Sequence, residues 1–158
     1  MIELRPPRLT YRHLKCVIGW LSDKEVMKYS EQRHVPHSIA SQFNYVNSFR
    51  EPHQYREIFY HGVFVGTVTG YIDRHNGVAD VGLLVGDKTV WGKGVGYTAW
   101  EAFCDSLAVR KIEAGCMSKN IGMIRIMERY GMVLEGRRKD HFMVNGETCD
   151  LLQYGRFK

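Results

Sequence analysis

The chain has 158 residues, of which 44% are hydrophobic and 12% aromatic, and this composition excludes a disordered chain. Lys and Arg number 22 against 17 Asp and Glu, but the basic residues are scattered, which argues against a nucleic-acid partner. No apolar stretch approaches the roughly 20 residues that cross a bilayer, and the N-terminal "MIELRPPRLTYRHLK" is charged where a signal peptide is apolar. We therefore expect a cytoplasmic protein with no membrane partner, folded as one domain over residues 1–158, either a monomer or a homodimer.

The N-terminal third predicts a short strand followed by two helices. The strand covers Ile2 to Arg5 and ends at two prolines, which cannot donate to a strand ladder. Thr10 is a candidate N-cap for a helix over Tyr11 to Leu21, and Ser38 for a second helix. Apolar residues at helical spacing indicate the second helix: Ile39, Phe43, Val46 and Phe49.

The middle of the chain changes to the pattern of β-strands. The runs "YREIFY", "VFVGTVTGYIDR" and "VADVGLLV" are rich in β-branched and aromatic residues, and the turn signals "HG" and "HNG" separate them. This pattern predicts an antiparallel meander. In its last strand, Asp80, Gly82 and Leu84 fall on one face, opposite the apolar alternation of Val81 and its neighbours.

Three alternating glycines, Gly92, Gly94 and Gly96, stand before the next helix-like run in "VGDKTVWGKGVGYTAWEAF". The spacing fits neither the Walker loop nor the dinucleotide fingerprint. Backbone N–H groups exposed at a helix N-terminus form an anion site, to which Lys93 adds a cation. The alternative is a glycine-rich turn that serves close packing.

The C-terminal part predicts two helices, a strand between them and a closing hairpin. Asn120 is a candidate N-cap for the second helix and Gly131 ends it. The first helix has an apolar stripe at helical spacing: Val95, Ala99, Phe103 and Leu107. In total, the fold class is a mixed α/β (α+β) sheet of about seven strands, with an antiparallel N-terminal meander and about four flanking helices.

The glycine segment "WGKGVGYTAWEAF" resembles the acetyl-CoA signature of the GNAT superfamily, the GCN5-related N-acetyltransferases. Its pattern [QR]-x-x-G-x-[GA] falls on residues 91–96, with Trp91 in place of Gln or Arg. A loop that reads W-G-K-G is similar to a branch with ribosomal-protein alanine N-acetyltransferases and small-molecule N-acetyltransferases. Downstream residues match the family's second segment: Asn120, Glu128, Gly131, Glu135, Gly136 and Asp150.

The resemblance implies a sheet splayed between its fourth strand, Val78 to Val85, and its fifth, Lys111 to Met117. It also implies acetyl-CoA as the acetyl donor and direct transfer without an acyl-enzyme. No metal is expected, because Pro36 breaks any helix that would bring His34 and His37 together and no third ligand is near. The pantetheine arm is expected in the gap and the pyrophosphate on the glycine loop. The implied cofactor-binding residues are Leu84, Val85, Trp91, Gly92, Lys93, Gly94, Val95, Gly96, Tyr97, Asn120 and Met123.

Asp80 is the candidate general base, because it stands where many relatives place a glutamate; a solvent-facing or ion-paired strand residue is the alternative. The general acid is left open. Met127 occupies the position where many relatives have a tyrosine, and Tyr130, one helical turn later, is expected to be a core residue. Cys116 is expected to be a core thiol rather than a nucleophile.

The polar and aromatic stretch "MKYSEQRHVPHS" joins the two N-terminal helices expected to roof the acceptor site. Tyr29, Glu31, Arg33 and His34 are therefore candidate acceptor-binding residues, with a solvated loop as the alternative. The expected acceptor is a primary amine, with an amino sugar on a nucleotide carrier favoured over a peptide N-terminus. The rival classes are a non-catalytic acyl-CoA-binding domain and a basic nucleic-acid-binding domain.

Overall fold

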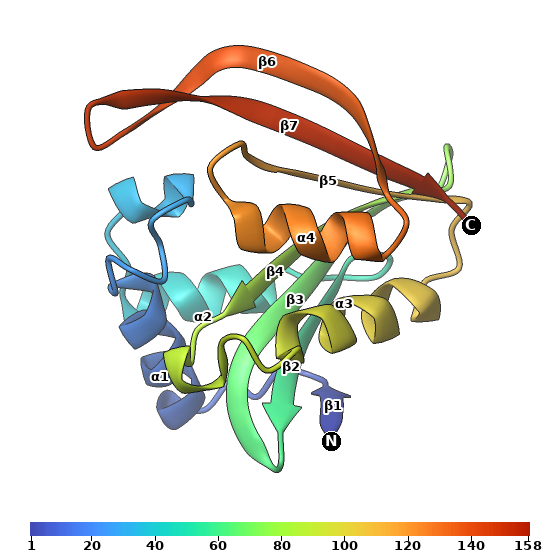
Figure 1. Cartoon of the computed structure of the whole chain (residues 1–158). Coiled ribbons are helices and arrows are strands. Elements are labelled where there is room, and N and C mark those ends of the chain that lie inside the picture. Colours follow the sequence, from blue (N-terminus) through green and yellow to red (C-terminus); the bar gives the residue numbers. More distant parts are fainter.

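The computed structural model describes all 158 residues and has one seven-stranded sheet in the order β1-β2-β3-β4-β5-β7-β6 (Figure 1). Only the β4–β5 pair is parallel, and the other neighbours are antiparallel. The predicted mixed sheet is confirmed. The strands are β1 (Ile2–Arg5), β2 (Gln54–Tyr60), β3 (Val63–Asp73), β4 (Val78–Val85), β5 (Lys111–Met117), β6 (Val133–Val144) and β7 (Glu147–Phe157).

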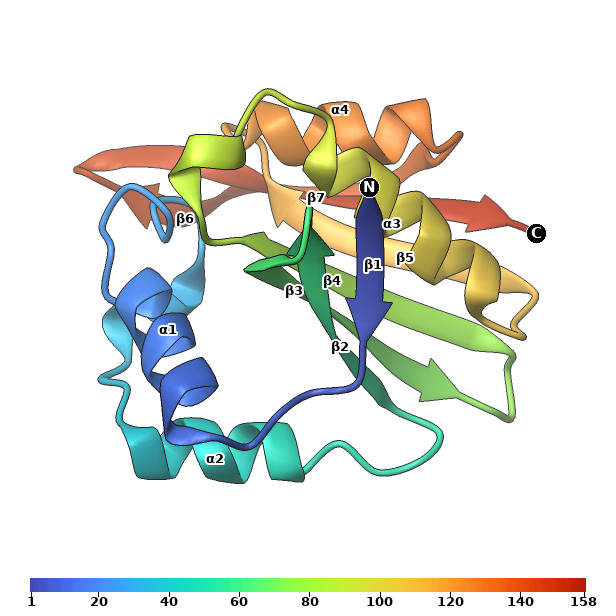
Figure 2. The ribbon, with the colours of Figure 1, turned by 90° about the horizontal axis from the view of Figure 1, so that it is seen from below.

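Four α-helices cover the sheet, α1 and α2 on one face and α3 and α4 on the other (Figures 1 and 2). The predicted N-caps are confirmed, because Thr10, Ser38 and Asn120 each accept a hydrogen bond from the first helical turn. The two short 3₁₀ helices were not predicted. The helices are α1 (Tyr11–Leu21), η1 (Glu31–His34), α2 (Ile39–Asn47), η2 (Lys88–Val90), α3 (Val95–Ser106) and α4 (Ile121–Arg129).

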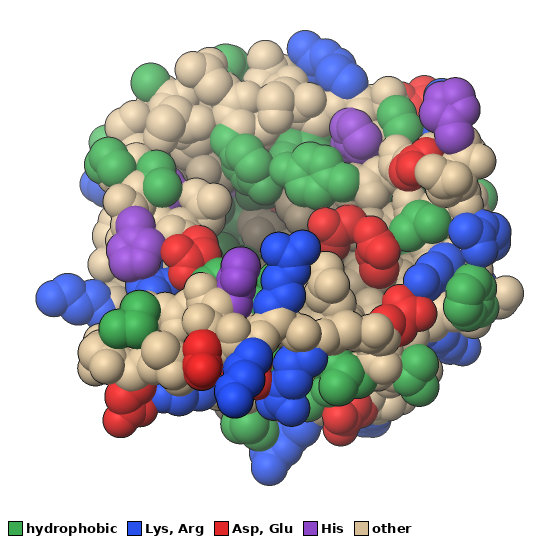
Figure 3. Space-filling view, turned by 90° about the horizontal axis from the view of Figure 1, so that it is seen from above, with side chains coloured by type: hydrophobic (Ala, Val, Ile, Leu, Met, Phe, Trp, Pro, Cys, Tyr) green, Lys and Arg blue, Asp and Glu red, His purple; other side chains and the backbone are tan.

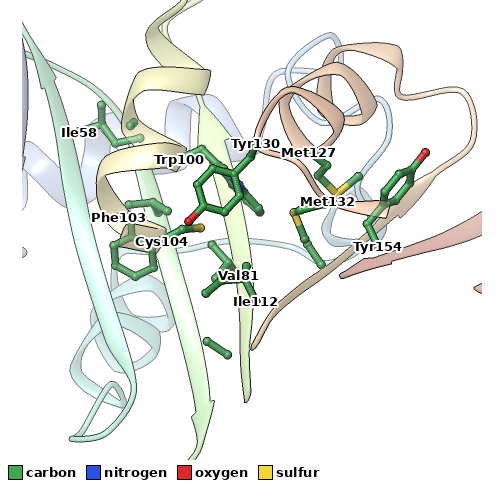
Figure 4. Close-up of a cluster of buried hydrophobic side chains, with 14 of the residues drawn as sticks. Ile58, Val81, Trp100, Phe103, Cys104, Ile112, Met127, Tyr130, Met132 and Tyr154 are labelled. Carbon is green, nitrogen blue, oxygen red and sulfur yellow. The ribbon is translucent and has the colours of Figure 1, made fainter. Parts of the chain in front are cut away.

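The hydrophobic core lies between the sheet and the α3/α4 layer (Figure 4). The predicted stripe of α3 is confirmed, since its members are at most 2% exposed. Trp100 and Phe103 of α3 pack with Ala79 and Val81 of β4 and with Ile112 of β5. One face of each central strand therefore contributes to the core.

The opposite face of the same strands is polar. Tyr55, Thr69 and Gly82 are register partners across β2, β3 and β4, and Tyr71 and Asp80 are partners one pair further along. Partners in a ladder point to the same side, so this face carries hydroxyl and carboxyl groups where the other carries the core. It turns toward α1 and α2.

The apolar stripe predicted for α2 is wrong at one residue, because Gln42 is buried in place of its neighbour Phe43. Phe43 is 40% exposed, whereas Gln42 is only 4% exposed, and Val46 is buried as expected. The physical reason is that α2 faces the polar side of the sheet, so hydrophobicity alone does not select its inward residues.

The predicted splay between β4 and β5 is confirmed. The two strands pair at only three positions, and the last pair is Asp80 with Glu113. Beyond this pair they run apart, as Figure 1 shows, while β4 stays paired with β3 up to Val85 and β5 with β7 up to Met117. Each strand therefore has one free backbone edge facing the gap.

Candidate functional site

A cleft of about 1510 Å³ occupies the gap between the free ends of β4 and β5. Its walls come from the loop between β4 and α3, the start of α4, the segment around η1, and the polar face of β2 and β3 with α2 above it. The face drawn in Figure 3 is hollowed near its centre, and hydrophobic side chains gather on one rim of the hollow. The cleft thus joins the glycine loop to the polar face of the sheet.

Gly92 and Gly94 give the loop its open conformation. Their φ angles are +77° and +79°, in the left-handed region that glycine tolerates, and an added Cβ would meet no atom within 4 Å at either residue. Gly94 is the N-cap of α3 and has no side chain to cap it. Thr98 is the first residue of this helix to donate to a carbonyl, that of Gly94 at 3.1 Å, so the preceding amides lack helical partners.

Gly96 has a different role, and the packing interpretation holds for it. A Cβ on Gly96 would lie 3.0 Å from Ile126 Cδ1 of α4 and 3.5 Å from side-chain atoms of Leu83 and Val85. The missing side chain therefore lets α3 approach both α4 and β4. The three alternating glycines divide between loop conformation and close packing.

Trp91 fixes the loop to the end of β4. Its indole N–H donates to the carbonyl oxygen of Val85 at 2.9 Å. On the far side of the loop, Lys88 of η2 pairs with Asp23 at 2.8 Å and with Glu25 at 3.2 Å, just beyond α1. Both attachments precede Gly92, so they hold the first part of the loop and the glycines follow them.

The start of α4 forms the opposite wall of the cleft. Asn120 Oδ1 accepts from the Met123 amide at 3.2 Å, and both residues line the cleft. Arg125 and Arg129 of the same helix also line it, and the Arg129 guanidinium stacks 3.8 Å above the Tyr97 ring. Sequence analysis missed these two arginines, although their i, i+4 spacing places both on the helix face that meets the glycine loop.

Asp80 lies where the ladder between β4 and β5 ends, and it borders two cavities. One is the large cleft, and the other is a smaller cavity of about 260 Å³ that Glu113 and Glu135 also line. The surrounding protein, which displaces water, and then the nearby Glu113 carboxylate raise the pKa of Asp80. A carboxylate with raised proton affinity beside a cleft is suited to accept a proton.

The residues considered as acids or nucleophiles have clear placements. Met127 is fully buried in the core, and the Tyr130 hydroxyl donates to Asp105 at 2.6 Å, away from the cleft, so its predicted core role is confirmed. Cys116 lines the cleft, but burial raises the pKa of its thiol to about 11. A thiol that stays protonated at neutral pH is a poor nucleophile.

The four candidate acceptor residues divide into two groups. Tyr29 and Glu31 line the cleft, whereas Arg33 and His34 do not. Arg33 instead donates to the backbone carbonyls of Ser30 and Met143, at 2.8 and 2.9 Å, and so ties η1 to the β6–β7 hairpin. Lys93, expected at the phosphates, also lies outside the cleft lining.

The polar side of the cleft was missed from the sequence. It consists of side chains from α2, β2 and β3: Gln42, Tyr45, Tyr55, Thr67, Thr69 and Tyr71. Their positions in the sequence are far apart, and only the strand register brings them together. No three His, Cys, Asp or Glu side chains form a metal-binding group, and no helix has the length and hydropathy of a membrane span.

A mixed sheet that splits between two parallel strands, with an uncapped helix start at the split, is the arrangement that the sequence resemblance implied. The sequence profile of the acetyltransferase (GNAT) domain matches residues 2–133. The chain therefore belongs to the GNAT family of acetyltransferases. A search among curated proteins gives no match.

Solved structures share this fold over nearly the whole chain. A ribosomal L7/L12 α-N-protein acetyltransferase, RimL, in complex with coenzyme A has a TM-score of 0.84 at 19% identity, covering 99% of this chain and 93% of its own. The microcin C7 self-immunity acetyltransferase MccE, in complex with acetyl-CoA and AMP, has a TM-score of 0.81 at 20% identity, covering 99% and 92%. A spermidine N-acetyltransferase SpeG chimera from Vibrio cholerae has 0.80 at 18%, covering 99% and 94%.

Proposed function

We propose that this protein transfers acetyl from acetyl-CoA directly to a primary amine. The observation that carries the proposal is the free edge of β4, which runs from Asp80 to Val85 along the same cleft that the uncapped first turn of α3 lines. An unpaired strand edge can bind the amides of pantetheine as an added strand. A helix N-terminus can bind the phosphates at its end. Two of the solved relatives were determined with coenzyme A or acetyl-CoA, which supports the same ligand here.

We assign the residues along the cleft to successive parts of coenzyme A, from its pantetheine arm to its pyrophosphate. In our proposal, the backbone of Leu84 and Val85 lies along the pantetheine arm, and Asn120 and Met123 contact it from the opposite wall. The amides of Gly92 and of residues 94–97 hold the pyrophosphate, whereas the Lys93 amide donates to the Val90 carbonyl. Arg125 and Arg129, which face the loop from α4, add the positive charge that the placement of Lys93 does not supply to the cleft.

The thioester supplies an activated acyl group, and the chain's contribution is positioning and proton transfer. Asp80 takes a proton from the ammonium form of the acceptor, directly or through one water. The amine lone pair then forms the C–N bond, the C–S bond breaks, the sulfur leaves with its electron pair, and the nitrogen gives up its second proton to solvent. The side chain of Met127 has no proton to donate to the sulfur. We therefore propose that solvent protonates the leaving thiolate.

For the acceptor we propose an amino sugar on a nucleotide carrier, with a peptide N-terminus as the second candidate. Lys28 and His37 line the cleft on the α1–α2 side, where they can meet the phosphates of a carrier. The second candidate is favoured by the likeness to RimL, an α-N-protein acetyltransferase with the same fold. A non-catalytic acyl-CoA-binding domain is disfavoured by the raised pKa of Asp80 beside the cleft.

A thiol-release assay with a panel of amines tests the proposal. We expect the protein to bind acetyl-CoA in calorimetry and to release free coenzyme A only when an amine acceptor is added. Mass spectrometry should find the acetyl group on the acceptor nitrogen. Tight binding of acetyl-CoA without acetylation of nucleotide-linked amino sugars, simple amines or peptides would instead support the non-catalytic alternative.

A further inference from the structure

The molecule has three buried polar side chains, and two of them face the cleft. The buried polar residues of the chain are Gln42, Glu57 and Thr67, which are 4%, 3% and 7% exposed. Glu57 is satisfied by protein groups, because His13 Nδ1 and the Arg8 amide lie 2.9 Å from its carboxylate. Gln42 and Thr67 have no such partners among charged or backbone groups and line the cleft instead.

Tyr55 connects these two residues. It is 4% exposed, and its hydroxyl lies beside both Gln42 and Thr67. A glutamine amide can donate two hydrogen bonds and accept two, so one tyrosine hydroxyl uses only part of its capacity. Buried polar groups are nearly always hydrogen-bonded. The remaining capacity of Gln42 is therefore available only to something inside the cleft.

Aromatic rings form the wall beside this polar floor. Phe49 lies between Tyr45 and Tyr71, with both ring-centroid distances equal to 5.2 Å. Tyr45 and Tyr71 line the cleft and remain 42% and 45% exposed. Tyr71 is also the register partner of Asp80. A group that packs against these rings and reaches the floor therefore sits next to the candidate base.

We infer that the Gln42–Tyr55–Thr67 floor and the Tyr45–Tyr71 wall form the acceptor-binding subsite, which selects amines carried on a compact, hydroxyl-bearing ring. The inference rests on the proposed function. A ring of this class offers C–H faces to the tyrosines and hydroxyl groups to Gln42 and Thr67. A purely apolar amine would leave these buried groups without partners, which costs affinity.

Other acceptor classes fit the subsite less well. The carboxylates that line the cleft are Glu25, Glu31 and Asp80, and Asp80 is the register partner of Tyr71 in the wall, so a linear polyamine would find few counter-charges beside the subsite. An extended peptide that binds by strand addition would need a free strand edge. The free edges of β4 and β5 face the gap between those strands, and the floor lies over the paired strands β2 and β3.

Two primary ring amines, one rich in hydroxyl groups and one without any, test the inference, and because their basicities also differ, both rates are referred to the concentration of the free amine. D-glucosamine and cyclohexylamine both carry a primary amine on a six-membered ring. We expect the parent protein to acetylate glucosamine with a kcat/KM at least about tenfold higher, the effect of one buried group losing its partner. Equal or better use of cyclohexylamine would overturn the inference while leaving the proposed function intact.

The variant Gln42→Leu keeps the side-chain size and removes the amide. It should lower kcat/KM for glucosamine roughly tenfold, leave cyclohexylamine unchanged, and leave acetyl-CoA binding unchanged. Asn44→Leu, an exposed amide on the same helix outside the cleft lining, is the matched control and should behave as the parent. An equal loss with both amines would mean that Gln42 is structural and would contradict the subsite.

A direct binding measurement separates the two proposals. Saturation-transfer NMR with glucosamine should show binding in the parent and weaker binding in Gln42→Leu. Binding without acetylation of any amine would uphold the subsite and refute the transferase proposal. Acetylation of other amines with no glucosamine binding would uphold the transferase proposal and refute the subsite.

Discussion

The indole N–H of Trp91 donates to the carbonyl oxygen of Val85 across the first turn of the loop that follows β4. Tryptophan stands here where the family signature has Gln or Arg, and its indole N–H supplies a hydrogen-bond donor. The bond fixes the start of the glycine loop against the strand edge expected to bind pantetheine. A carbonyl has two lone pairs, so Val85 keeps one for a ligand.

Trp91→Phe should therefore raise KM for acetyl-CoA by about three- to tenfold, because the ring stays but one hydrogen bond is lost. The melting temperature should change little, since the side chain is 41% exposed. Trp91→Gln restores a donor and should recover much of the loss. If Phe and Gln behave alike in steady-state kinetics, the hydrogen bond does not position the loop.

Gly94→Glu should abolish measurable acetyl-CoA binding in calorimetry, because a carboxylate at the start of α3 repels phosphate and blocks the amides. The backbone itself is a complication, since φ at Gly94 is +79°. Gly94→Asn is the control, because asparagine tolerates this conformation and is neutral. It should retain most of the binding, and comparable losses in both variants would point to backbone strain alone.

The pH dependence of the reaction should report on Asp80. Because its pKa is raised, the active carboxylate form is lost as pH falls through a value above the ordinary aspartate range. Glu113→Gln removes the neighbouring charge, so the acidic limb of the kcat/KM profile should move to lower pH. Asp80→Asn should lower kcat by roughly 10²-fold or more and flatten that limb. A limb unmoved by either change would assign the base elsewhere.

The charged Asp80 carboxylate should also lower the stability of the folded protein at neutral pH. A carboxyl group whose pKa is raised on folding favours the folded state when protonated, and this contribution is lost as pH rises through the folded pKa. Asp80→Asn should thus have a higher melting temperature than the parent at pH 7, with the difference shrinking toward pH 4. Thermal unfolding at the two pH values checks this, and a lower melting temperature at pH 7 would contradict it.

Asn120→Asp should separate the cap from the proposed ligand contact. Aspartate caps α4 as well as asparagine does, so the variant should melt near the parent. It loses the amide donor and adds negative charge to the cleft, so acetyl-CoA should bind more weakly. Asn120→Ala should lose both, including about 1 kcal/mol of stability. Normal acetyl-CoA affinity in Asn120→Asp would leave the residue as a cap only.

Local patterns predicted the elements well, because capping, alternation and glycine placement are local physics. Asn120 and the bounds of β4 and β5 are examples. The acceptor floor was not predictable in this way. Gln42 carries no signal in its own segment, and its inward position follows from the polar strands that α2 happens to face. Arg33 shows the converse, since a polar loop residue became a tie to a hairpin 110 residues away.

The parting of β4 and β5 leaves two unsatisfied strand edges in the middle of a sheet. Free edges invite pairing with another chain, which is how β-proteins aggregate. Here the edges lie inside a cleft, and the bond from Arg33 to Met143 helps to hold η1 against the hairpin beside it. A ligand that lies along these edges acts as the missing strand. We therefore expect a ligand in this cleft to do two things, to enter the chemistry and to cover backbone groups that would otherwise be open to pairing with another chain.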